Sequence, residues 1–260
     1  MSPATTAGLH TMTLPRIAGR DEWLAARTEL LEQEKRLTRE RDALNTRRRE
    51  LPMVEIEKSY RFEGTGGPAN LSDLFEGRRQ LIVCHFMFKP EWDDGCPSCT
   101  AGADNVADGM RRQLEVRDTT LAYVSRAPLE KLERYKAKRG WTFPWYSSFG
   151  SDFNLDFGVT VDESVAPAAY NYKTREEHEA AGTGYYFEGE QPIEQPGVSC
   201  FLRVDDRVFH TYSSFGRVRP AGRPVDQVRK FGAASRALSA RPFGSSQSSW
   251  RPSAVRSRNA

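Results

Sequence analysis

The residues best suited to chemistry are two cysteines in the run Cys96-Pro97-Ser98-Cys99. A nearly continuous apolar segment precedes them and a helical pattern follows, so the pair is expected at the start of a helix. The helix dipole and unpaired backbone N–H groups favour the thiolate there, and the thiolate is the nucleophile. Cys96 is the predicted nucleophile, and Cys99 resolves a mixed disulfide across one helical turn. Pro97 suits the first turn because its missing N–H would have had no partner.

Two other interpretations of the pair stay open. A structural zinc site needs four ligands, and the sequence offers no second Cys-x-x-Cys and no His pair at ligand spacing. No metal and no other cofactor is therefore expected. Alternatively, both thiols are inert. Cys84 and Cys200 are themselves interpreted as small hydrophobic core residues on neighbouring strands.

Two of the four histidines raise the question of a role near the pair. His85 lies on the strand that leads to the cysteines, and a histidine beneath the helix could relay the proton of Cys99. The alternative is a histidine satisfied within the core. His210, on the last strand, is the weaker candidate for a site role, and His178, like His10, is expected in a mobile polar stretch without a role.

Acidic residues precede the pair. Glu91, Asp93 and Asp94 carry carboxylates that oppose formation of a thiolate at Cys96. We therefore expect the pKa of Cys96 to be about 7–8, below the ordinary thiol value of about 8.5 but above that of strong oxidants.

A long charged helix is predicted for residues 20–50, because the segment from Asp21 onward has no Gly or Pro and Pro52 follows it. Apolar residues recur on it at every seventh position: Trp23, Leu30, Leu37, Leu44 and Leu51. Gln33 and Glu40 occupy the second row that a coiled coil needs. The helix is expected to lie across its own or a partner's domain, and a homodimer through this helix is the alternative.

Residues 51–216 are predicted to form one α/β domain with a central mixed sheet. Strands are expected at 54–62, 80–88, 120–125, 141–146, 198–204 and 207–212, and helices at 98–116 and 128–139. The segment 80–88 is almost wholly apolar, which is typical of a central strand buried on both faces. Residues 163–195 are expected to be an irregular insertion.

The charge is distributed unevenly along the 260 residues. The net charge of +3 combines +9 in residues 217–260 with −6 in residues 1–216. The basic tail, rich in Ala, Gly, Pro, Arg and Ser, is interpreted as disordered or as the product of a frameshift. Residues 1–19 are also expected to be disordered. A nucleic-acid partner is not expected, because the basic charge lies in the tail alone.

No segment approaches 18 consecutive apolar residues, and the first twenty lack the apolar core of a signal peptide. A cytoplasmic protein without a membrane partner is therefore expected.

Several runs together resemble a bacterial thioredoxin-like family of unknown function, related to thioredoxins and peroxiredoxins. The runs are residues 81–88, the loop 89–95 with the Cys-Pro-Ser-Cys motif, and residues 125–128, 140–145, 147–154 and 208–213. The resemblance covers roughly Trp23 to Gly216 and implies a thioredoxin-like fold. It also implies a cis-proline beside the reactive sulfur. Pro196 is the candidate, with Val198 as the other residue at that position.

The sequence thus predicts a thiol–disulfide oxidoreductase that reduces a disulfide or a peroxide. An unknown thiol reductant would restore its dithiol. A second class stays open: a non-catalytic binding or assembly module that keeps the thioredoxin-like scaffold and uses the long helix to bind partners.

Overall fold

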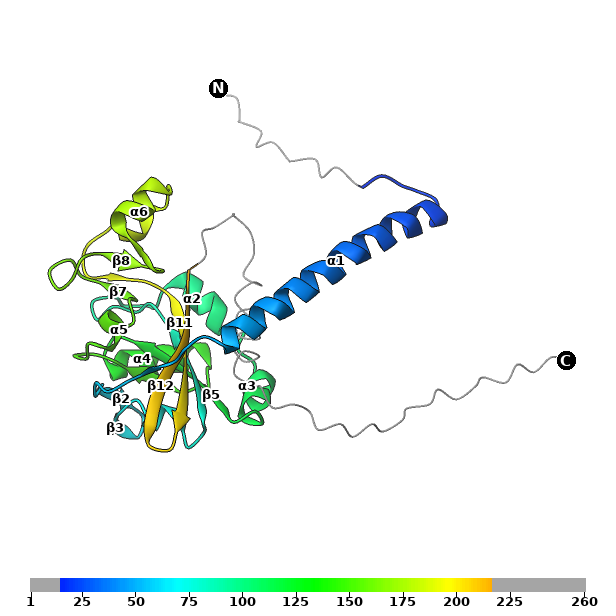
Figure 1. Cartoon of the computed structure of the whole chain (residues 1–260). Helices are drawn as coiled ribbons and strands as arrows, with labels where there is room; N and C mark the ends of the chain where they lie inside the picture. Colours follow the sequence, from blue (N-terminus) through cyan, green and yellow to red (C-terminus); the bar gives the residue numbers. More distant parts are fainter. Residues whose placement is uncertain (1–14, 217–260) are drawn as a thin grey trace, which may run out of the picture. The chain divides into compact units, whose positions relative to one another are not determined.

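The computed structural model describes residues 15–216. The chain divides into two units, residues 1–47 and 48–260. The first holds most of the predicted long helix, α1 (Arg20–Arg49), which runs without a break (Figure 1). The predictions for residues 1–14 and for the tail 217–260 lie outside the described residues. Among residues 15–216 no helix combines the length and the apolar character that crossing a bilayer requires.

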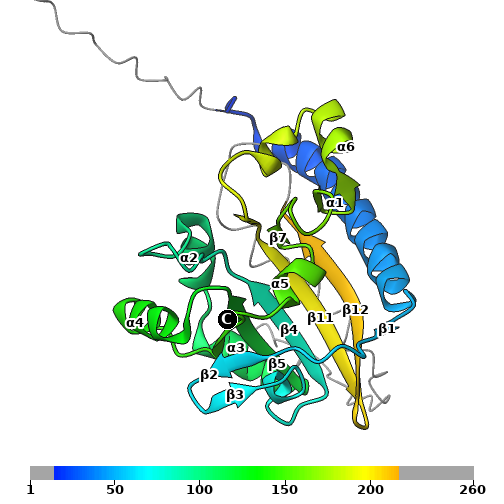
Figure 2. The same cartoon turned by 90° about the vertical axis from the view of Figure 1, so that its left-hand side faces the viewer.

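The second unit is built on an eight-stranded sheet with the order β1-β12-β11-β4-β5-β6-β2-β3. The strands are β1 (Val54–Glu55), β2 (Phe62–Gly64), β3 (Gly67–Ala69), β4 (Gln80–His85), β5 (Thr119–Ser125), β6 (Trp145–Ser147), β11 (Gly197–Val204) and β12 (Arg207–Phe215). β4, β5 and β6 are parallel, whereas β11 is antiparallel to both β4 and β12. Figure 2 shows β12, β11, β4 and β5 side by side.

This arrangement is thioredoxin-like. Two parallel strands joined by a helical crossover, β4 and β5, lie beside the antiparallel hairpin β11–β12. The α/β class and the mixed central sheet were predicted, as were strands near both positions of the hairpin. The predicted strand at 54–62 is instead two short strands, β1 and β2, which join opposite edges of the sheet.

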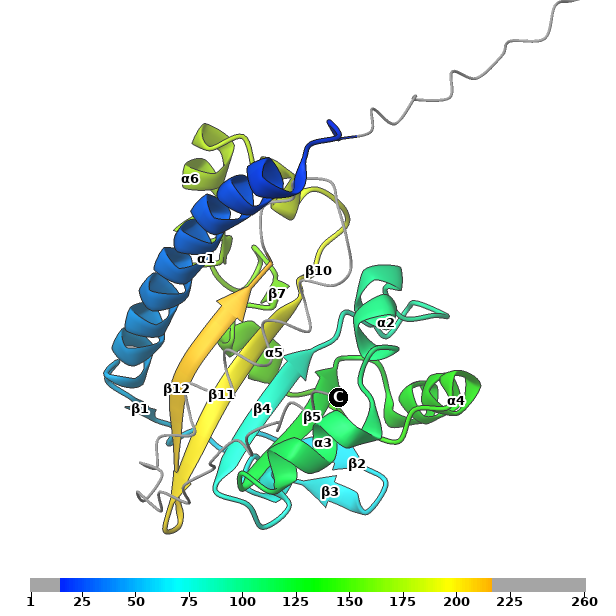
Figure 3. The same cartoon turned by 90° about the vertical axis from the view of Figure 1, so that its right-hand side faces the viewer.

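Helices cover both faces of the sheet, as the views in Figures 2 and 3 show from two sides. On one face lie α2 (Pro97–Ala103), α3 (Asp108–Glu115) and α4 (Leu129–Arg139), packed on Ile82 and Cys84 of β4. On the other face lie η1 (Asp73–Phe75) and α5 (Phe153–Asp156), packed on Leu81 and Val83. The side chains of β4 therefore alternate between two cores, as expected for a strand buried on both faces.

The helix predicted over 98–116 is two helices. α2 ends at Ala103, and the N–H groups of Asn105 and Val106 bond to carbonyls three residues back. The Asn105 side chain also donates to the carbonyl of Ala101 at 2.6 Å. After this tighter turn, Val106 packs against the core.

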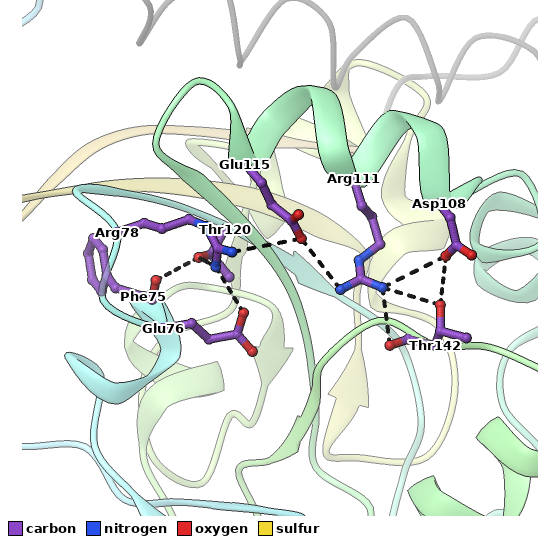
Figure 4. Close-up of polar contacts among 8 residues, drawn as sticks. All are labelled: Phe75, Glu76, Arg78, Asp108, Arg111, Glu115, Thr120 and Thr142. Carbon is purple, nitrogen blue, oxygen red and sulfur yellow. Dashed lines mark hydrogen bonds and ion pairs between the residues drawn. The ribbon is translucent and has the colours of Figure 1, made fainter.

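A polar network fixes α3 at the edge of the sheet where β5 begins (Figure 4). Arg111 donates to the carbonyl and hydroxyl oxygens of Thr142, each at 3.2 Å, and Arg78 donates to the Thr120 hydroxyl at 3.2 Å. Glu115 lies between the two guanidinium groups, at 3.9 and 3.8 Å. The guanidinium groups and Glu115 are half-buried, and the network orients the crossover between β4 and β5.

The segment predicted as an irregular insertion, 163–195, is folded. It contains β8 (Ala169–Tyr170), β9 (Lys173–Thr174), α6 (Arg175–Ala180), η2 (Gly184–Phe187) and β10 (Ile193–Glu194), which pairs with β7 (Thr160–Val161). Its aromatic residues Tyr170, Tyr186 and Phe187 form a third core with Phe215 of β12. The apolar surface that these aromatic residues bury stabilises the segment, although its sequence shows no regular pattern of apolar residues.

His178 belongs to this third core rather than to a mobile stretch. It is buried, and its Nε2–H donates to the carbonyl of Tyr170 at 2.9 Å. Its Nδ1 lies 2.7 Å from the Thr183 hydroxyl. Both ring nitrogens are satisfied, so His178 is a structural residue.

Candidate redox site

The chain beyond β4 is held firmly before it reaches the cysteines. Phe86 N–H donates to the carbonyl of Val124 at 2.9 Å, and the Ser125 hydroxyl donates to the carbonyl of Phe86 at 2.7 Å. After a loop, the N–H of Cys96 donates to the carbonyl of Met87 at 3.0 Å. The loop therefore leaves the strand end and returns to it, which places Cys96 at the C-terminal end of β4.

Two lysines hold the loop 89–95. Lys131 of α4 donates to the carbonyls of Pro90 and Trp92 at 2.7 and 2.9 Å. Lys89 donates to the carbonyl of Glu190, in the segment before β10, at 2.9 Å. The loop is thus tied both to α4 and to the folded insertion.

Gly95 lets the loop return close to the core. A Cβ atom at this position would lie 2.5 Å from Cε1 of Phe86 and 3.3 Å from Cε1 of Tyr135. Any side chain would collide with the Phe86 ring. The backbone next to Cys96 therefore lies directly on aromatic side chains.

Cys96 is the N-cap of α2 and Pro97 is its first residue, as predicted. The Cys96 carbonyl accepts hydrogen bonds from the N–H and the hydroxyl of Thr100, both at 2.9 Å. The Thr100 hydroxyl also lies 2.9 Å from the hydroxyl of Tyr135 on α4. These bonds fix the first turn of α2, on which both cysteines are carried.

The pKa of Cys96 is lowered to about 6, chiefly by a hydrogen bond from the Cys99 thiol. The backbone N–H groups of Cys99 and Ser98 also face the sulfur and favour the thiolate, although neither forms a full cap hydrogen bond. Partial burial acts in the opposite direction. Cys96 is therefore a thiolate at neutral pH.

The expected effect of the acidic loop is wrong. Glu91, Asp93 and Asp94 are not among the groups that shift the pKa of Cys96, which lies below the expected 7–8. Asp94 is instead paired with Lys138 of α4 at 2.9 Å. The carboxylates are exposed, and solvent screens what remains of their charge.

Cys99 has the opposite character. Its side chain packs against the core of Ile82, Cys84 and Phe86. The hydrogen bond to Cys96 and then burial raise the pKa of Cys99 well above the ordinary value. The two sulfurs thus share one proton, with the thiolate on the more exposed sulfur and the thiol on the buried one.

His85 does not lie beneath the dithiol, so the predicted proton relay to Cys99 is wrong. Its side chain projects from the other face of β4, where its ring stacks on Phe153 at 5.6 Å between centroids. Its Nε2 lies 2.8 Å from the Ser199 hydroxyl. Burial, with a smaller contribution from His210, lowers its pKa to about 3. The prediction placed α2 over the face of β4 that carries His85, whereas α2 covers the other face.

The residues beneath Cys99 are Cys84 and Tyr123. The Tyr123 hydroxyl interacts with the Cys84 sulfur, and burial raises the pKa values of both groups well above their ordinary ranges. Cys200 is buried on the neighbouring strand, where burial raises its pKa to about 12. Cys84 and Cys200 are core residues, as predicted. Tyr123 was missed, because only the pairing of β4 with β5 brings it here.

Pro196 is not a cis-proline. Among residues 15–216 the only cis peptide bond joins Gln191 to Pro192. Pro196 directly precedes β11, in which Gly197 pairs with His85 and Val198 with Cys84. It therefore lies near the same end of β4 as the dithiol, as predicted, but with a trans peptide bond.

Tyr170 is a residue of this region that the sequence analysis missed. Its hydroxyl donates to the carbonyl of Pro196 and accepts from the N–H of Gly216, both at 2.7 Å. Burial raises its pKa, and Cys99 is among the groups that contribute, so the phenol lies near the dithiol. Tyr170 lies in a segment that was interpreted as irregular, so its sequence position did not indicate that it would lie near the dithiol.

A buried ion pair lies at the same end of the sheet. Glu194 is 4% exposed, and one carboxylate oxygen lies 3.1 Å from the guanidinium of Arg126, which directly follows β5. The Thr160 hydroxyl donates to its other oxygen at 3.0 Å. Burial raises the pKa of Glu194 to about 7, against the lowering effects of Arg126, Thr160, Lys89 and Asn154. Residues 15–216 hold no group of three or more His, Cys, Asp or Glu side chains placed for a metal ion.

The comparisons with known proteins identify a family. A family model described as a bacterial protein of unknown function, DUF899, matches residues 12–231. No curated protein matches the chain.

Solved structures give distant likenesses. One, from a study of the alkyl peroxide reduction activity of the Xanthomonas campestris bacterioferritin comigratory protein, is 13% identical, with 67% of this chain and 91% of that chain covered and a TM-score of 0.41. The peroxidoxin BcpB from Mycobacterium tuberculosis is 12% identical, with 74% and 98% covered and a TM-score of 0.42. A putative thiol:disulfide interchange protein DsbE from Chlorobium tepidum is 14% identical, with 72% and 99% covered and a TM-score of 0.38.

Proposed function

The chain belongs to the bacterial DUF899 family, whose function is unknown, and from its dithiol we propose that it is a thiol–disulfide oxidoreductase. One observation carries the proposal. The Cys96 thiolate accepts a hydrogen bond from the protonated Cys99 at the start of α2. The Cys96 sulfur is thereby nucleophilic, whereas Cys99 stays protonated and unreactive until Cys96 has reacted.

The reaction uses the two cysteines, the substrate and a thiol reductant. The Cys96 thiolate attacks one sulfur of a substrate disulfide, forming a mixed disulfide and releasing a thiolate. The Cys99 proton passes to that leaving group. The Cys99 thiolate then attacks the Cys96 sulfur, which closes the Cys96–Cys99 disulfide and releases the second substrate sulfur as a thiolate that takes its proton from water. A thiol reductant returns two electrons and one proton, which restores the Cys96 thiolate and the Cys99 thiol.

A peroxide is the second substrate class. Attack of Cys96 on the O–O bond would give a sulfenic acid and an alcohol or water. Cys99 would then condense with the sulfenic acid to give the same disulfide and one water. The dithiol serves both substrates, so an assay has to include each of them.

The reduced state of the cysteines fits an enzyme that reduces substrates in a reducing compartment. All four cysteines are free. A cytoplasmic location would keep them so and would supply the thiol reductant.

The test is reduction of a protein disulfide, such as that of insulin, and of hydrogen peroxide and an alkyl hydroperoxide, with dithiothreitol as the reductant. Cys96→Ser should abolish turnover. Cys99→Ser should accumulate a mixed disulfide on Cys96, detectable by mass spectrometry. Cys200→Ala, which removes a thiol away from the helix, is the matched control and should retain turnover. The absence of thiol-dependent turnover by the wild-type protein on every substrate would contradict the proposal.

One observation favours the alternative, an assembly role. α1 spaces Trp23, Leu30, Leu37 and Leu44 seven residues apart along a single helix. We propose that this row binds a second copy of the chain. Sedimentation of the wild-type protein and of Leu37→Glu measures it. A dimer that Leu37→Glu converts to a monomer is expected, and a monomeric wild-type protein would contradict it.

A further inference from the structure

The core beneath α2 contains two polar groups that the proposed reaction does not use. Cys84 of β4 and Tyr123 of β5 are direct partners in the parallel pairing of these strands, so their side chains lie side by side on the face that α2 covers. Each is 4% exposed. Cys99 of α2 packs against the same cluster of hydrophobic side chains. A thiol and a phenol are thus buried beside the resolving cysteine.

Tyr123 is held in place by other aromatic rings. Its ring stacks on Phe143, with 4.2 Å between centroids, and meets the edges of Phe86 and Trp145 at 6.2 and 6.4 Å. Its hydroxyl donates a hydrogen bond to the Cys84 sulfur, which gives the buried phenol a partner. The sulfur accepts this bond with a lone pair, so the S–H hydrogen of Cys84 is left to donate elsewhere.

Cys84 acts on its neighbours as a neutral thiol. Burial raises its pKa well above the ordinary value, so it keeps its hydrogen at neutral pH. An S–H group is a weak donor to a neutral acceptor, but a hydrogen bond to an ionised acceptor is roughly twice as strong. The Cys84 hydrogen therefore gains a strong acceptor when Cys99 becomes a thiolate.

Cys99 needs a donor in one step of the reaction. While Cys96 is a thiolate, Cys99 keeps its proton and donates a hydrogen bond to it. Once Cys96 has formed a mixed disulfide, that charge is gone, and Cys99 has to become a thiolate against the packed core. Burial opposes this ionisation, and the backbone N–H of Met87 favours it. A charge in such a place is costly unless hydrogen bonds satisfy it.

The neighbouring side chains leave Cys84 as the group that can supply a second hydrogen bond. Burial raises the pKa values of Tyr123 and Tyr170, so both remain neutral phenols in this step. The Tyr123 hydroxyl donates to the Cys84 sulfur, and the Tyr170 hydroxyl donates to the carbonyl of Pro196. Of these three buried groups, Cys84 alone has a hydrogen that is not already donated.

We propose that Cys84 is a further catalytic residue, which donates a hydrogen bond from its S–H group to the Cys99 thiolate during resolution, and that Tyr123 positions it. The inference rests on the proposed function, in which Cys99 resolves the mixed disulfide. No proton passes between these groups, since Cys84 and Tyr123 keep their hydrogens. The Cys99 electron pair forms the bond to Cys96, and the substrate sulfur leaves with the pair of the broken disulfide bond.

The test is the reaction of the full-length protein with one equivalent of the aromatic disulfide DTNB, followed by stopped-flow absorbance at neutral pH. Attack by Cys96 releases one coloured thionitrobenzoate, and resolution by Cys99 releases the second in a phase whose rate is independent of reagent concentration. Thionitrobenzoate is too weak a base to take the Cys99 proton, which passes to water because Cys99 is only half-buried. The second phase therefore reports how readily Cys99 ionises.

Cys84→Ala should slow the second phase about tenfold and leave the first phase unchanged, because the lost donor acts on Cys99 and not on Cys96. Cys84→Val, which fills the space with an apolar side chain, should slow it as much. Cys84→Ser keeps a donor and should retain the rate. Tyr123→Phe should slow the second phase less, because Cys84 keeps its own hydrogen.

Cys200→Ala is the matched control. It removes a buried thiol of the same cluster that lies opposite Ile82, farther from the end of β4 at which α2 begins. Both phases should keep their wild-type rates in this variant.

Failure of this inference can be told from failure of the proposed function. A wild-type protein that releases a single thionitrobenzoate has no resolving thiol, which overturns both. Two releases with a second phase that Cys84→Ala leaves unchanged, or that Cys84→Val and Cys84→Ser slow equally, overturn the inference alone. If the phases merge or the Cys84 variants do not fold, ultraviolet absorbance gives the pKa of Cys99 in Cys96→Ala. Adding Tyr123→Phe should raise that pKa, and an unchanged value overturns the inference.

Discussion

Cys84 and His85 are adjacent on β4 and face opposite sides of the sheet. Cys84 lies beneath the dithiol, against Tyr123 and Cys99, whereas His85 lies among the aromatic residues of the other core. The dithiol and His85 thus lie on opposite faces of the sheet. Changes on one side are expected to leave the other unaffected.

The first prediction tests this separation. His85→Gln should leave the pH dependence of Cys96 alkylation unchanged, because no group of the dithiol contacts His85. It should lower thermal stability, since the glutamine has to replace a ring stacked on Phe153. Alkylation by iodoacetamide across a pH series, next to a thermal melt, measures both. A shifted alkylation profile in the folded variant would contradict the separation.

The second prediction concerns the origin of the low pKa of Cys96. Cys99→Ala removes the main hydrogen bond to the thiolate, so the pKa of Cys96 should rise from about 6 toward the ordinary thiol value. Ultraviolet absorbance of the thiolate across a pH series measures it. Ser98→Ala is the matched control, because it keeps the backbone N–H and should leave the pKa unchanged. An unchanged pKa in Cys99→Ala would assign the effect to the helix terminus instead.

The third prediction concerns stability and pH. The pKa of Glu194 is raised to about 7 in the folded protein from an ordinary value of 4.5. The folded state therefore holds this proton more tightly than the unfolded state. The resulting stabilisation is fully present below about pH 4.5 and is lost as the pH rises through 7. The slope is at most about 1.4 kcal/mol per pH unit.

Urea unfolding at several pH values between these limits measures the slope. Glu194→Gln should remove this contribution, and the substitution of an exposed residue, Glu188→Gln, should retain it. His85 contributes with the opposite sign, since its lowered pKa gives stability that is lost as the pH falls. The difference between the variant and the wild type isolates Glu194. An equal slope in both would show that the carboxyl is not buried in the folded protein.

The fourth prediction concerns the loop next to Cys96. Gly95→Ala places a Cβ atom against the Phe86 ring and should destabilise the protein by about 1–3 kcal/mol. Gly109→Ala is the matched control. Its Cβ meets no atom within 4 Å, and it lies inside α3, where alanine is favoured by up to about 1 kcal/mol. Chemical unfolding of both variants gives the comparison, and equal stabilities would contradict the close approach of the loop.

Sequence patterns predicted those features whose cause is local. The apolar run of β4, strands near the positions of β11 and β12, and a cysteine pair at a helix start each follow from neighbouring residues. The assignment of Cys96 as the nucleophile and Cys99 as the resolving thiol rests on their order on the helix and stays a prediction.

Features that depend on long-range contacts were not predicted. His85 was expected beneath α2 because it is close in sequence to the dithiol, but only the path of the chain decides that α2 covers the other face of β4. Tyr170 reaches Pro196 through a segment whose order comes from packing rather than from periodicity. Asp94 was expected to act on Cys96 because it is close in sequence, whereas it pairs with Lys138, which lies 44 residues later.

The Tyr170 hydroxyl has a consequence for how this domain can vary among its relatives. One oxygen joins the folded insertion to the carbonyl of Pro196 and to the last residue of the described chain, Gly216. Residues 163–195 are therefore bonded to the rest of the domain and are part of its structure. A lineage that lost residues 163–195 would leave a carbonyl beside the dithiol without its donor, and would need to evolve another hydroxyl or amide in the same place.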